Sequence, residues 1–341
     1  MTKTKHSCVF LSRLFSPHRG GVEKHVESVA KELLNKGYEV SVITEQFHKR
    51  LKLVEIYKGI KVFRIPYPLL KGKMGIWSWM IKNAPQFSQA DIIHCHDVFW
   101  WYLPLRIILF FKPVFTTFHG YEKLQGPSKK TIFVRKLAEK LSFGNICIGG
   151  WMKKWYLTSP SIISYGGADI IPTKVKKTKD AIFLGRFAQD TGVLEIICAV
   201  DQLKGKVLLD VYGMGEFEKQ VQKACSLSPF CSFKGEAKDS EEIFPQYRRA
   251  FVSQYLSIIE AVQSHCEVFA YAPNELKKDY IHALPIAKHL HMFSSSLEFV
   301  SLLNSSTANR KYHLDNAFSW AKQQTWKKVV HQYEDLWKKY L

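Results

Sequence analysis

The sequence lacks the features of several protein classes. Its seven cysteines form no Cys-x-x-Cys pair, are odd in number and mostly lie within apolar runs. Reduced thiols in a cytosolic protein are therefore a better interpretation than disulfides or a zinc site. No apolar run reaches the roughly 18 residues of a membrane span, and no leader pattern opens the chain. We expect a protein that is soluble or peripheral on a membrane.

Acidic residues are scarce. The chain has 30 Asp and Glu against 49 Lys and Arg, which gives a formal net charge of +19 at pH 7. Such a charge favours a polyanionic partner, either nucleic acid or an anionic membrane surface. A generally basic proteome would produce the same excess. The chain is otherwise ordinary, because its 341 residues are 46% hydrophobic and 23% charged, enough for two packed cores.

Short apolar strands alternate with helical patterns along the chain, which predicts an α/β fold with doubly wound parallel sheets. The alternation pauses in a polar, lysine-rich segment after residue 171 and restarts near residue 181. We therefore predict two Rossmann-like domains, residues 1–170 and 171–315. Residues 316–341, rich in Trp and Lys, are predicted as one C-terminal helix.

A Pro/Gly-rich loop follows the first strand and contains Gly20 and Gly21, after which a helical pattern begins at Val22. Two glycines at a helix start let backbone N–H groups approach an anion, and the helix dipole favours a phosphate there. Tight turn geometry alone explains such a pair about as well. The loop is a candidate phosphate site only if other residues face it.

Polar residues end two later strands of the first half, namely His96, Asp97, His119 and Glu122. Ligands of doubly wound sheets collect at the carboxyl ends of strands, so these side chains are candidates to contact a ligand. A lone histidine is more often structural, and a metal site at His94 and His96 lacks a third ligand with suitable spacing. No metal is expected.

The second half offers Arg186 after a strand, and Glu260 in an apolar helix predicted over residues 258–264. A guanidinium can clamp a diphosphate, and a carboxylate can accept the hydroxyl groups of a ribose. A solvated surface arginine and an acid that favours the helix dipole are the alternatives. Gly213 lies in a glycine loop after another strand.

Aromatic and basic residues mix in three segments of the first half, residues 71–80, 99–102 and 151–156. Trp with Lys suits the headgroup layer of a membrane, and the same mixture can stack single-stranded nucleic acid. For any one segment, the ordinary arrangement, with aromatic side chains in the core and lysines at the surface, is favoured over both of these interpretations.

Taken together, these patterns resemble the retaining glycosyltransferases of family 4, over nearly the whole chain. Each motif is weak alone, but their order is specific. The motifs that carry the resemblance are residues 20–26, 91–97, 117–122, 166–169, 183–187, 212–215, 233–235 and 260–261.

The resemblance implies a GT-B fold, in which two Rossmann-like domains face each other across a cleft and the C-terminal helix crosses back to the first domain. It implies that a nucleotide-sugar donor is held at its diphosphate by Gly20, Gly21 and Arg186, with Gly213 nearby, and at its ribose by Glu260. His119 would contact the transferred sugar, and we assign catalytic roles to His119, Arg186 and Glu260. His96, Asp97 and Glu122 would lie on the acceptor side. Members usually need neither metal nor cofactor.

Two positions depart from the family pattern. Thr191 stands where the family has a diphosphate lysine, and Val252 stands where it has the first acid of its Glu-x7-Glu motif. Lys277, just past a strand, is a candidate replacement for the lysine. The departures fit either a divergent subgroup or a catalytically impaired relative that still binds ligands.

The expected function is transfer of a sugar, with retention, to a glycan or lipid-linked acceptor in cell-surface polysaccharide or glycolipid synthesis. The expected location is the cytoplasm, with peripheral attachment to the inner face of the plasma membrane through its anionic surface. Nucleic-acid binding is a third hypothesis, which the absence of a recognised nucleic-acid motif disfavours.

Overall fold

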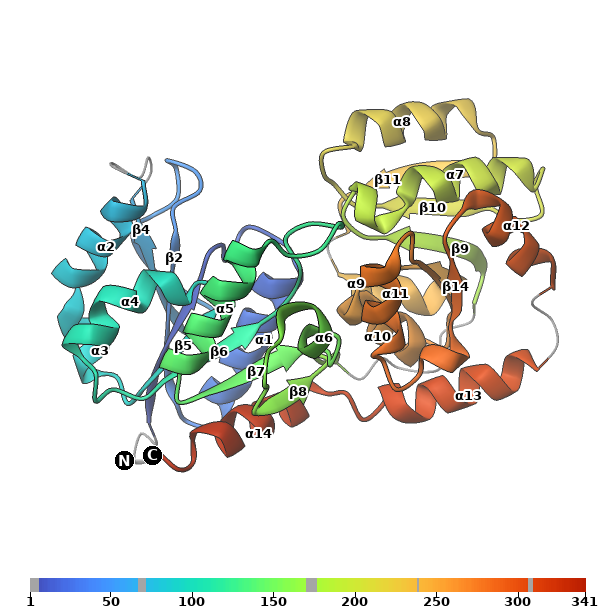
Figure 1. Ribbon diagram of the computed structural model, residues 1–341. Helices are drawn as coiled ribbons and strands as arrows, with labels where there is room; N and C mark the ends of the chain where they lie inside the picture. The colour runs from blue at the N-terminus through green and yellow to red at the C-terminus, as the bar shows by residue number, and fades with distance from the viewer. Residues whose placement is uncertain (1–5, 67–71, 170–176, 238, 306–308) are drawn as a thin grey trace. The chain divides into compact units, whose positions relative to one another are not determined.

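The computed structural model describes residues 6–66, 72–169, 177–237, 239–305 and 309–341. It divides into two compact units, one of residues 1–122, 126–164 and 326–341, the other of residues 123–125 and 165–325. The domain boundary predicted between residues 170 and 171 lies outside the described residues. Each unit is an α/β layer structure built around one sheet (Figure 1).

The N-terminal unit has a sheet of eight described strands, parallel except for the edge strand β3. Strands such as β5 and β6 are buried along their whole length, as expected where helices cover both faces of a sheet. In sheet order the strands are β3 (Val54–Tyr57), β4 (Ile60–Ile65), β2 (Glu39–Glu45), β1 (Ser7–Ser12), β5 (Ile92–His96), β6 (Val114–Phe118), β7 (Gly144–Ile148) and β8 (Ile162–Ser164).

The helices of this unit lie on both faces of the sheet. α1 (Gly21–Asn35) joins β1 to β2, which lies on the β3 side of β1 in the sheet. α4 (Phe99–Ile108) joins β5 to β6 and α5 (Lys129–Leu141) joins β6 to β7, so these connections move across the sheet toward β8, in the opposite direction. Right-handed connections therefore place α1 opposite α4 and α5. The remaining helices are α2 (Lys73–Lys82), which contacts α4, α3 (Ala84–Gln89), α6 (Met152–Tyr156) and α14 (Trp326–Trp337), which packs on α1.

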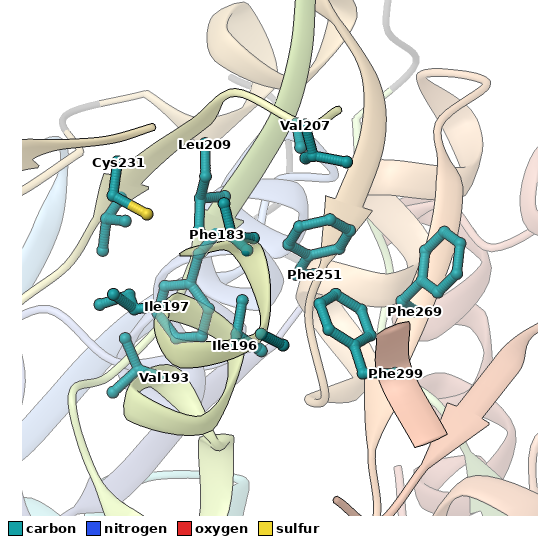
Figure 2. Close-up of a cluster of buried hydrophobic side chains, with 14 of the residues drawn as sticks. Phe183, Val193, Ile196, Ile197, Val207, Leu209, Cys231, Phe251, Phe269 and Phe299 are labelled. Atoms are coloured by element: carbon teal, nitrogen blue, oxygen red, sulfur yellow. The ribbon is translucent and has the colours of Figure 1, made fainter. Parts of the chain in front are cut away.

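The second unit has a parallel sheet of six described strands. An apolar core cluster joins α7 and α12 to the sheet through side chains such as Phe183, Ile196, Phe251 and Phe299 (Figure 2). In sheet order the strands are β11 (Cys231–Gly235), β10 (Leu209–Tyr212), β9 (Lys179–Leu184), β12 (Tyr247–Phe251), β13 (Glu267–Tyr271) and β14 (His291–Phe293).

The helices of the second unit are α7 (Val193–Gln202), α8 (Glu218–Leu227), α9 (Ser240–Ile243), α10 (Tyr255–Gln263), α11 (Glu275–His282), α12 (Ser296–Ser305) and α13 (Arg310–Ala321). Short 3₁₀ turns are η1 (Gln189–Thr191), η2 (Phe244–Gln246) and η3 (Ala287–His289). None of the described helices is long and apolar enough to cross a membrane. Six of the seven cysteines are buried, Cys198 is exposed, and all seven are free thiols.

The prediction of one helix over residues 316–341 is wrong. The segment forms the end of α13 and, after a turn, α14. The buried Gln263 amide donates hydrogen bonds to the carbonyl oxygens of Ala321 (2.8 Å) and Gln324 (3.2 Å), which fixes these oxygens in the turn. α13 belongs to the second unit, while α14 belongs to the N-terminal unit.

Candidate functional site

The glycine loop begins after β1 and ends at Gly20, the N-cap residue of α1, whose backbone is extended and which makes no side-chain cap. A Cβ atom at Gly20 would lie 2.4 Å from Oε2 of Glu23, so the glycine leaves room for that carboxylate at the helix start. His18 pairs with Glu23 through Nδ1 and Oε1, 2.9 Å apart. Gly21 is the first helical residue and is exposed. The start of α1 is thus open to solvent, and the Glu23 carboxylate lies next to it.

Three of the predicted residues meet at the carboxyl ends of β5 and β6. The Asp97 carboxylate accepts hydrogen bonds from the backbone N–H of His119, at 3.1 and 3.3 Å. Nδ1 of His96 lies 2.9 Å from Nε2 of His119. The two strands are parallel neighbours, with His96 aligned to Thr117, and this register brings the residues together. Their predicted contact with substrate stays a prediction.

Sequence reasoning missed Arg135, a buried side chain of α5 that organises this strand edge. Its Nη2 donates to the carbonyl oxygen of Gly120 (3.1 Å) and to Oε1 of Glu122 (2.9 Å), and lies 3.9 Å from Asp97. Its guanidinium carbon is 3.7 Å from the ring centre of Tyr156. Glu122, predicted on the acceptor side, therefore has a structural partner in this arginine.

Burial sets the protonation of the strand edge. It raises the pKa of Asp97 to about 6, although the nearby Arg135 charge and the hydrogen bond from His119 N–H oppose the shift. It lowers the pKa of His119 to about 3 and holds the pKa of His96 well below its ordinary value. Both imidazoles are neutral at pH 7, so His119 offers a hydrogen bond rather than a positive charge.

A second missed feature is a chain of hydrogen bonds from α14 to α1. Trp337 Nε1 donates to Nδ1 of His94 (3.2 Å), so the neutral His94 carries its proton on Nε2, which lies 2.7 Å from Oγ1 of Thr117. Thr117 Oγ1 is 2.9 Å from the Tyr333 hydroxyl, which is 2.9 Å from Nε2 of His25. Because the indole N–H can only donate, each following group in the chain accepts one hydrogen bond and donates the next. Nε2 of His25, the last group, is therefore an acceptor. The chain therefore fixes the tautomer of His25.

In the second unit, Arg186 lies two residues beyond β9, and its side chain is 65% exposed. Its Nη2 contacts the carboxylate of Asp190 at 3.0 and 3.2 Å, and Asp190 also accepts from Nε2 of Gln254 at 3.1 Å. Asp190, which sequence reasoning missed, orients the guanidinium. Thr191 is buried, and its hydroxyl donates to the carbonyl oxygens of Arg186 and Ala188, so it shapes the turn.

Lys277 is fully buried in α11, and its Nζ donates to the carbonyl oxygen of Ser253 at 2.7 Å. Nζ also lies 4.6 Å from the ring centre of Tyr280. Burial lowers the pKa of Lys277 to about 7, the negative charge of Asp190 opposes that shift, and the positive charge of Arg186 adds to it. These couplings put Lys277 in the same electrostatic environment as Arg186. Its predicted role as a replacement phosphate ligand stays a prediction.

Glu260 is buried in α10, but its predicted place near the helix start is wrong. α10 begins at Tyr255, whose backbone N–H donates to the Tyr280 hydroxyl at 3.0 Å. The Tyr280 hydroxyl, which belongs to α11 and cannot be inferred from the local sequence, thus satisfies a backbone N–H at the start of α10. The helix therefore begins before residue 258, where it was predicted to start. Glu260 consequently lies beyond the first turn, where an acid gains little from the helix dipole. Val252, at the position of the expected first acid, is buried as well, and its N–H bonds to the Phe269 carbonyl oxygen.

Gly213 follows β10 with φ of +148°. A Cβ atom there would lie 1.9 Å from the carbonyl oxygen of Gly185, so the fold itself requires glycine at this position. Its donor-binding role remains a prediction. Among the described residues, no group of three or more His, Cys, Asp and Glu side chains is arranged to hold a metal ion.

Comparison with protein families matches residues 19–159 to the model described as Glycosyltransferase Family 4. A human component of phosphatidylinositol N-acetylglucosaminyltransferase is 29% identical over 104 residues, which are 29% of this chain and 21% of that protein. The GPI3 component of the same transferase from Saccharomyces cerevisiae is 28% identical over 91 residues, 25% of this chain and 20% of that protein. The chain thus spans about a fifth of the length of the curated relatives it matches.

Solved structures match nearly the whole chain. Sucrose-phosphate synthase from Thermosynechococcus elongatus has a TM-score of 0.78 at 16% identity and covers 98% of this chain and 99% of its own. Anabaena HepE in complex with UDP and glucose has a TM-score of 0.76 at 15% identity, covering 98% and 100%. WaaG, a glycosyltransferase involved in lipopolysaccharide biosynthesis, has a TM-score of 0.68 at 14% identity, covering 96% and 99%. The predicted GT-B fold is confirmed, and the resemblance to family 4 is confirmed over residues 19–159.

Proposed function

We propose that this chain, whose fold is GT-B and whose residues 19–159 match Glycosyltransferase Family 4, transfers a sugar from a nucleotide donor to a glycan or lipid-linked acceptor. The reaction retains the anomeric configuration and serves cell-surface polysaccharide or glycolipid synthesis. The observation that carries the proposal is the ion pair of Arg186 and Asp190 beyond β9 of the second unit, to which the buried Lys277 of α11 is coupled electrostatically. Two cationic side chains, one of them held by a carboxylate, suit a diphosphate.

The donor is a nucleoside diphosphate sugar. HepE has been crystallised with UDP-glucose, with UDP and with UDP and glucose, which supports a donor of the same chemical class here. Arg186 and Lys277 contact the diphosphate, with Gly213 beside it. A phosphate-binding role for Gly20 and Gly21, at the start of α1 in the N-terminal unit, stays a prediction. Glu260 accepts the ribose hydroxyl groups.

In the reaction, the bond between the anomeric carbon and the phosphate oxygen breaks, and the acceptor hydroxyl oxygen bonds to the same face of that carbon. The departing phosphate oxygen takes the proton of the acceptor hydroxyl. The positive charges near the diphosphate stabilise the leaving group, which needs neither a side-chain base nor a metal. The neutral His119 hydrogen-bonds the transferred sugar, and His96, Asp97 and Glu122 belong to the acceptor side.

We further propose that the protein works in the cytoplasm at the inner face of a membrane, where it would meet a lipid-linked acceptor. Two of the curated relatives are named as subunits of phosphatidylinositol N-acetylglucosaminyltransferase. The positive net charge of +19 suits an anionic membrane surface. No partner nucleic acid is expected.

A non-catalytic binding protein is the second candidate. Thr191 and Val252 replace a lysine and an acid of the family pattern, and both side chains are buried within the second unit. This candidate predicts donor binding without turnover. The activity test must therefore distinguish this non-catalytic binding protein from an active glycosyltransferase.

The test measures donor binding first and turnover second. Calorimetry with UDP-glucose and other nucleotide sugars identifies a donor, and labelled donor is then incubated with the protein and a pooled lipid and glycan extract. We expect transfer to an extracted acceptor and slow donor hydrolysis in its absence. Binding with neither reaction would support the non-catalytic candidate, and no binding to any nucleotide sugar would refute both.

A further inference from the structure

The end of α4, the turn after it and the outer side of α5 carry large apolar side chains that face solvent. Their exposed fractions run from 36% to 75%, whereas such side chains normally lie in the core. We name this region the α4–α5 surface. Its apolar members are Ile107, Ile108, Phe110, Phe111, Phe133, Val134 and Leu137.

The two halves of the α4–α5 surface are held together by Arg106. Its Nε donates to the carbonyl oxygen of Leu141 at the end of α5 (2.8 Å), and its Nη1 donates to the carbonyl oxygen of Phe110. The guanidinium also lies over the ring of Phe143, 5.1 Å from its centre. The apolar turn at Phe110 and Phe111 is therefore fixed beside the C-terminal end of α5.

Basic side chains border these apolar residues. α5 carries exposed lysines at positions 129, 130, 136 and 140, and at 3.6 residues per turn Lys129, Lys136 and Lys140 line the helix edge next to Phe133. The acidic residue of this helix, Glu139, points toward Ser159. Its Oε1 accepts a hydrogen bond from the backbone N–H of Ser159 at 2.8 Å. The α4–α5 surface is therefore apolar with a positively charged border.

The sequence had placed a membrane contact elsewhere. In two of the aromatic-basic segments it singled out, Trp101 and Tyr102 are fully buried and Trp151 is 3% exposed, so these rings belong to the core. In the third segment Lys71 lies outside the described residues, whereas Met74 is 69% exposed and Trp77 is 36% exposed. The larger set of exposed apolar side chains lies on the α4–α5 surface.

We propose that the α4–α5 surface docks on an anionic lipid membrane, with Phe110, Phe111 and Phe133 in the interfacial layer and the lysines at the headgroups. Aromatic burial and opposite charge act together in that layer, and each lysine near an anionic surface contributes about 1 kcal/mol. The positive border and the net charge of +19 match a negatively charged surface. This inference extends the proposed function, but docking requires no donor and no transfer.

The test is flotation of the full-length protein with vesicles of phosphatidylcholine alone and with about 30% phosphatidylglycerol, a composition chosen for roughly natural negative charge. We expect binding to the anionic vesicles and at least tenfold weaker binding to the neutral ones. The double variant Phe110→Ala, Phe111→Ala should lose about tenfold or more in the partition coefficient. The triple variant Lys129→Gln, Lys130→Gln, Lys140→Gln should lose about tenfold or more and become less sensitive to salt.

Matched controls come from the second unit. Leu227→Ala with Leu297→Ala removes two side chains that are each 75% exposed, and Lys219→Gln with Lys223→Gln removes two exposed lysines of α8. Both controls should bind vesicles like the unmodified protein. Equal binding to the two vesicle types, or an equal loss in the controls, would overturn the proposal. So would a dimer in light scattering that the phenylalanine variant abolishes without any vesicle binding. Donor affinity, measured separately, should be unchanged in every variant, so failure here leaves the proposed function standing.

Discussion

Lys277 shows how burial sets the chemistry of a single residue. The side chain has no solvent exposure and its pKa is lowered to about 7, whereas an exposed lysine titrates near 10.5. Below pH 7 the free protein holds a charged amine beside Arg186. Above pH 7 that amine is increasingly neutral, and a bound diphosphate must draw in a proton to restore the charge.

The affinity for a nucleotide sugar should therefore fall as pH rises above about 7, by up to tenfold per pH unit, with uptake of up to about one proton on binding. Calorimetry at pH 6.5 and 8.5, in two buffers of different ionisation enthalpy, measures both quantities. The variant Lys277→Met should bind more weakly, with affinity that varies little with pH. A pH-independent affinity in the unmodified protein would show that Lys277 does not meet the diphosphate.

Two glycines of the second unit should respond differently to alanine. Gly213 has a φ of +148°, and an added Cβ would lie 1.9 Å from a backbone oxygen, whereas Gly235 has a φ of +73° with no atom within 4 Å of an added Cβ. Gly213→Ala should lower the free energy of unfolding by several kcal/mol, and Gly235→Ala by only about 1 kcal/mol. Urea unfolding compares the two, and similar losses would contradict the close approach to Gly185.

For individual residues, the sequence predicts which polar side chains lie at the ends of strands, but not which of them form hydrogen bonds or ion pairs with one another. His96, Asp97 and His119 were predicted at one sheet edge, because parallel neighbouring strands end together. Asp190 and Arg135 were missed, since their partners depend on how a turn and a helix pack. A lone arginine in the otherwise half-apolar helix α5 was the available signal for Arg135.

Among the elements, α14 shows how a terminal helix is tied into a core. It contributes the fully buried Tyr333 and Trp337, and the Tyr333 hydroxyl lies between Thr117 of β6 and His25 of α1. These contacts explain why the helix belongs to the N-terminal unit although it is last in sequence. The turn that separates α14 from α13 was not predictable from the local sequence, because it depends on Gln263, more than 50 residues away in the chain.

Replacing Tyr333 with Phe should remove both hydrogen bonds and leave buried partners unsatisfied, at a cost of about 1–3 kcal/mol in the free energy of unfolding. Tyr340→Phe is the control, because this ring is 40% exposed. Thermal and urea unfolding, followed by tryptophan fluorescence, measure the difference. If both variants unfold like the unmodified protein, the chain from Trp337 to His25 contributes nothing to stability.

For the whole molecule, the alternation of strands and helices was predictable, because buried parallel strands appear in sequence as continuous apolar runs separated by helical patterns. The antiparallel edge strand β3 was missed, since its four residues alternate between exposed and partly buried positions. The aromatic segments were ambiguous for a related reason. Composition does not distinguish Trp101, which is in the core, from Phe110, which is exposed.

The central prediction for the whole molecule is that it binds a nucleotide sugar. Arg186 would hold the diphosphate, and the buried Glu260 would hold the ribose. A ligand that binds only the folded protein stabilises it by about 2.7 kcal/mol at roughly 100 times its Kd, which raises the Tm of a protein of this size by several degrees.

A thermal-shift series with nucleoside diphosphates and their sugars, on the unmodified protein and on Arg186→Ala and Glu260→Ala, is the most direct test. We predict a rise in Tm of several degrees with at least one nucleotide sugar, and a rise close to zero with the same compound in each variant. The absence of a shift with every compound, or an undiminished shift in both variants, would contradict this prediction.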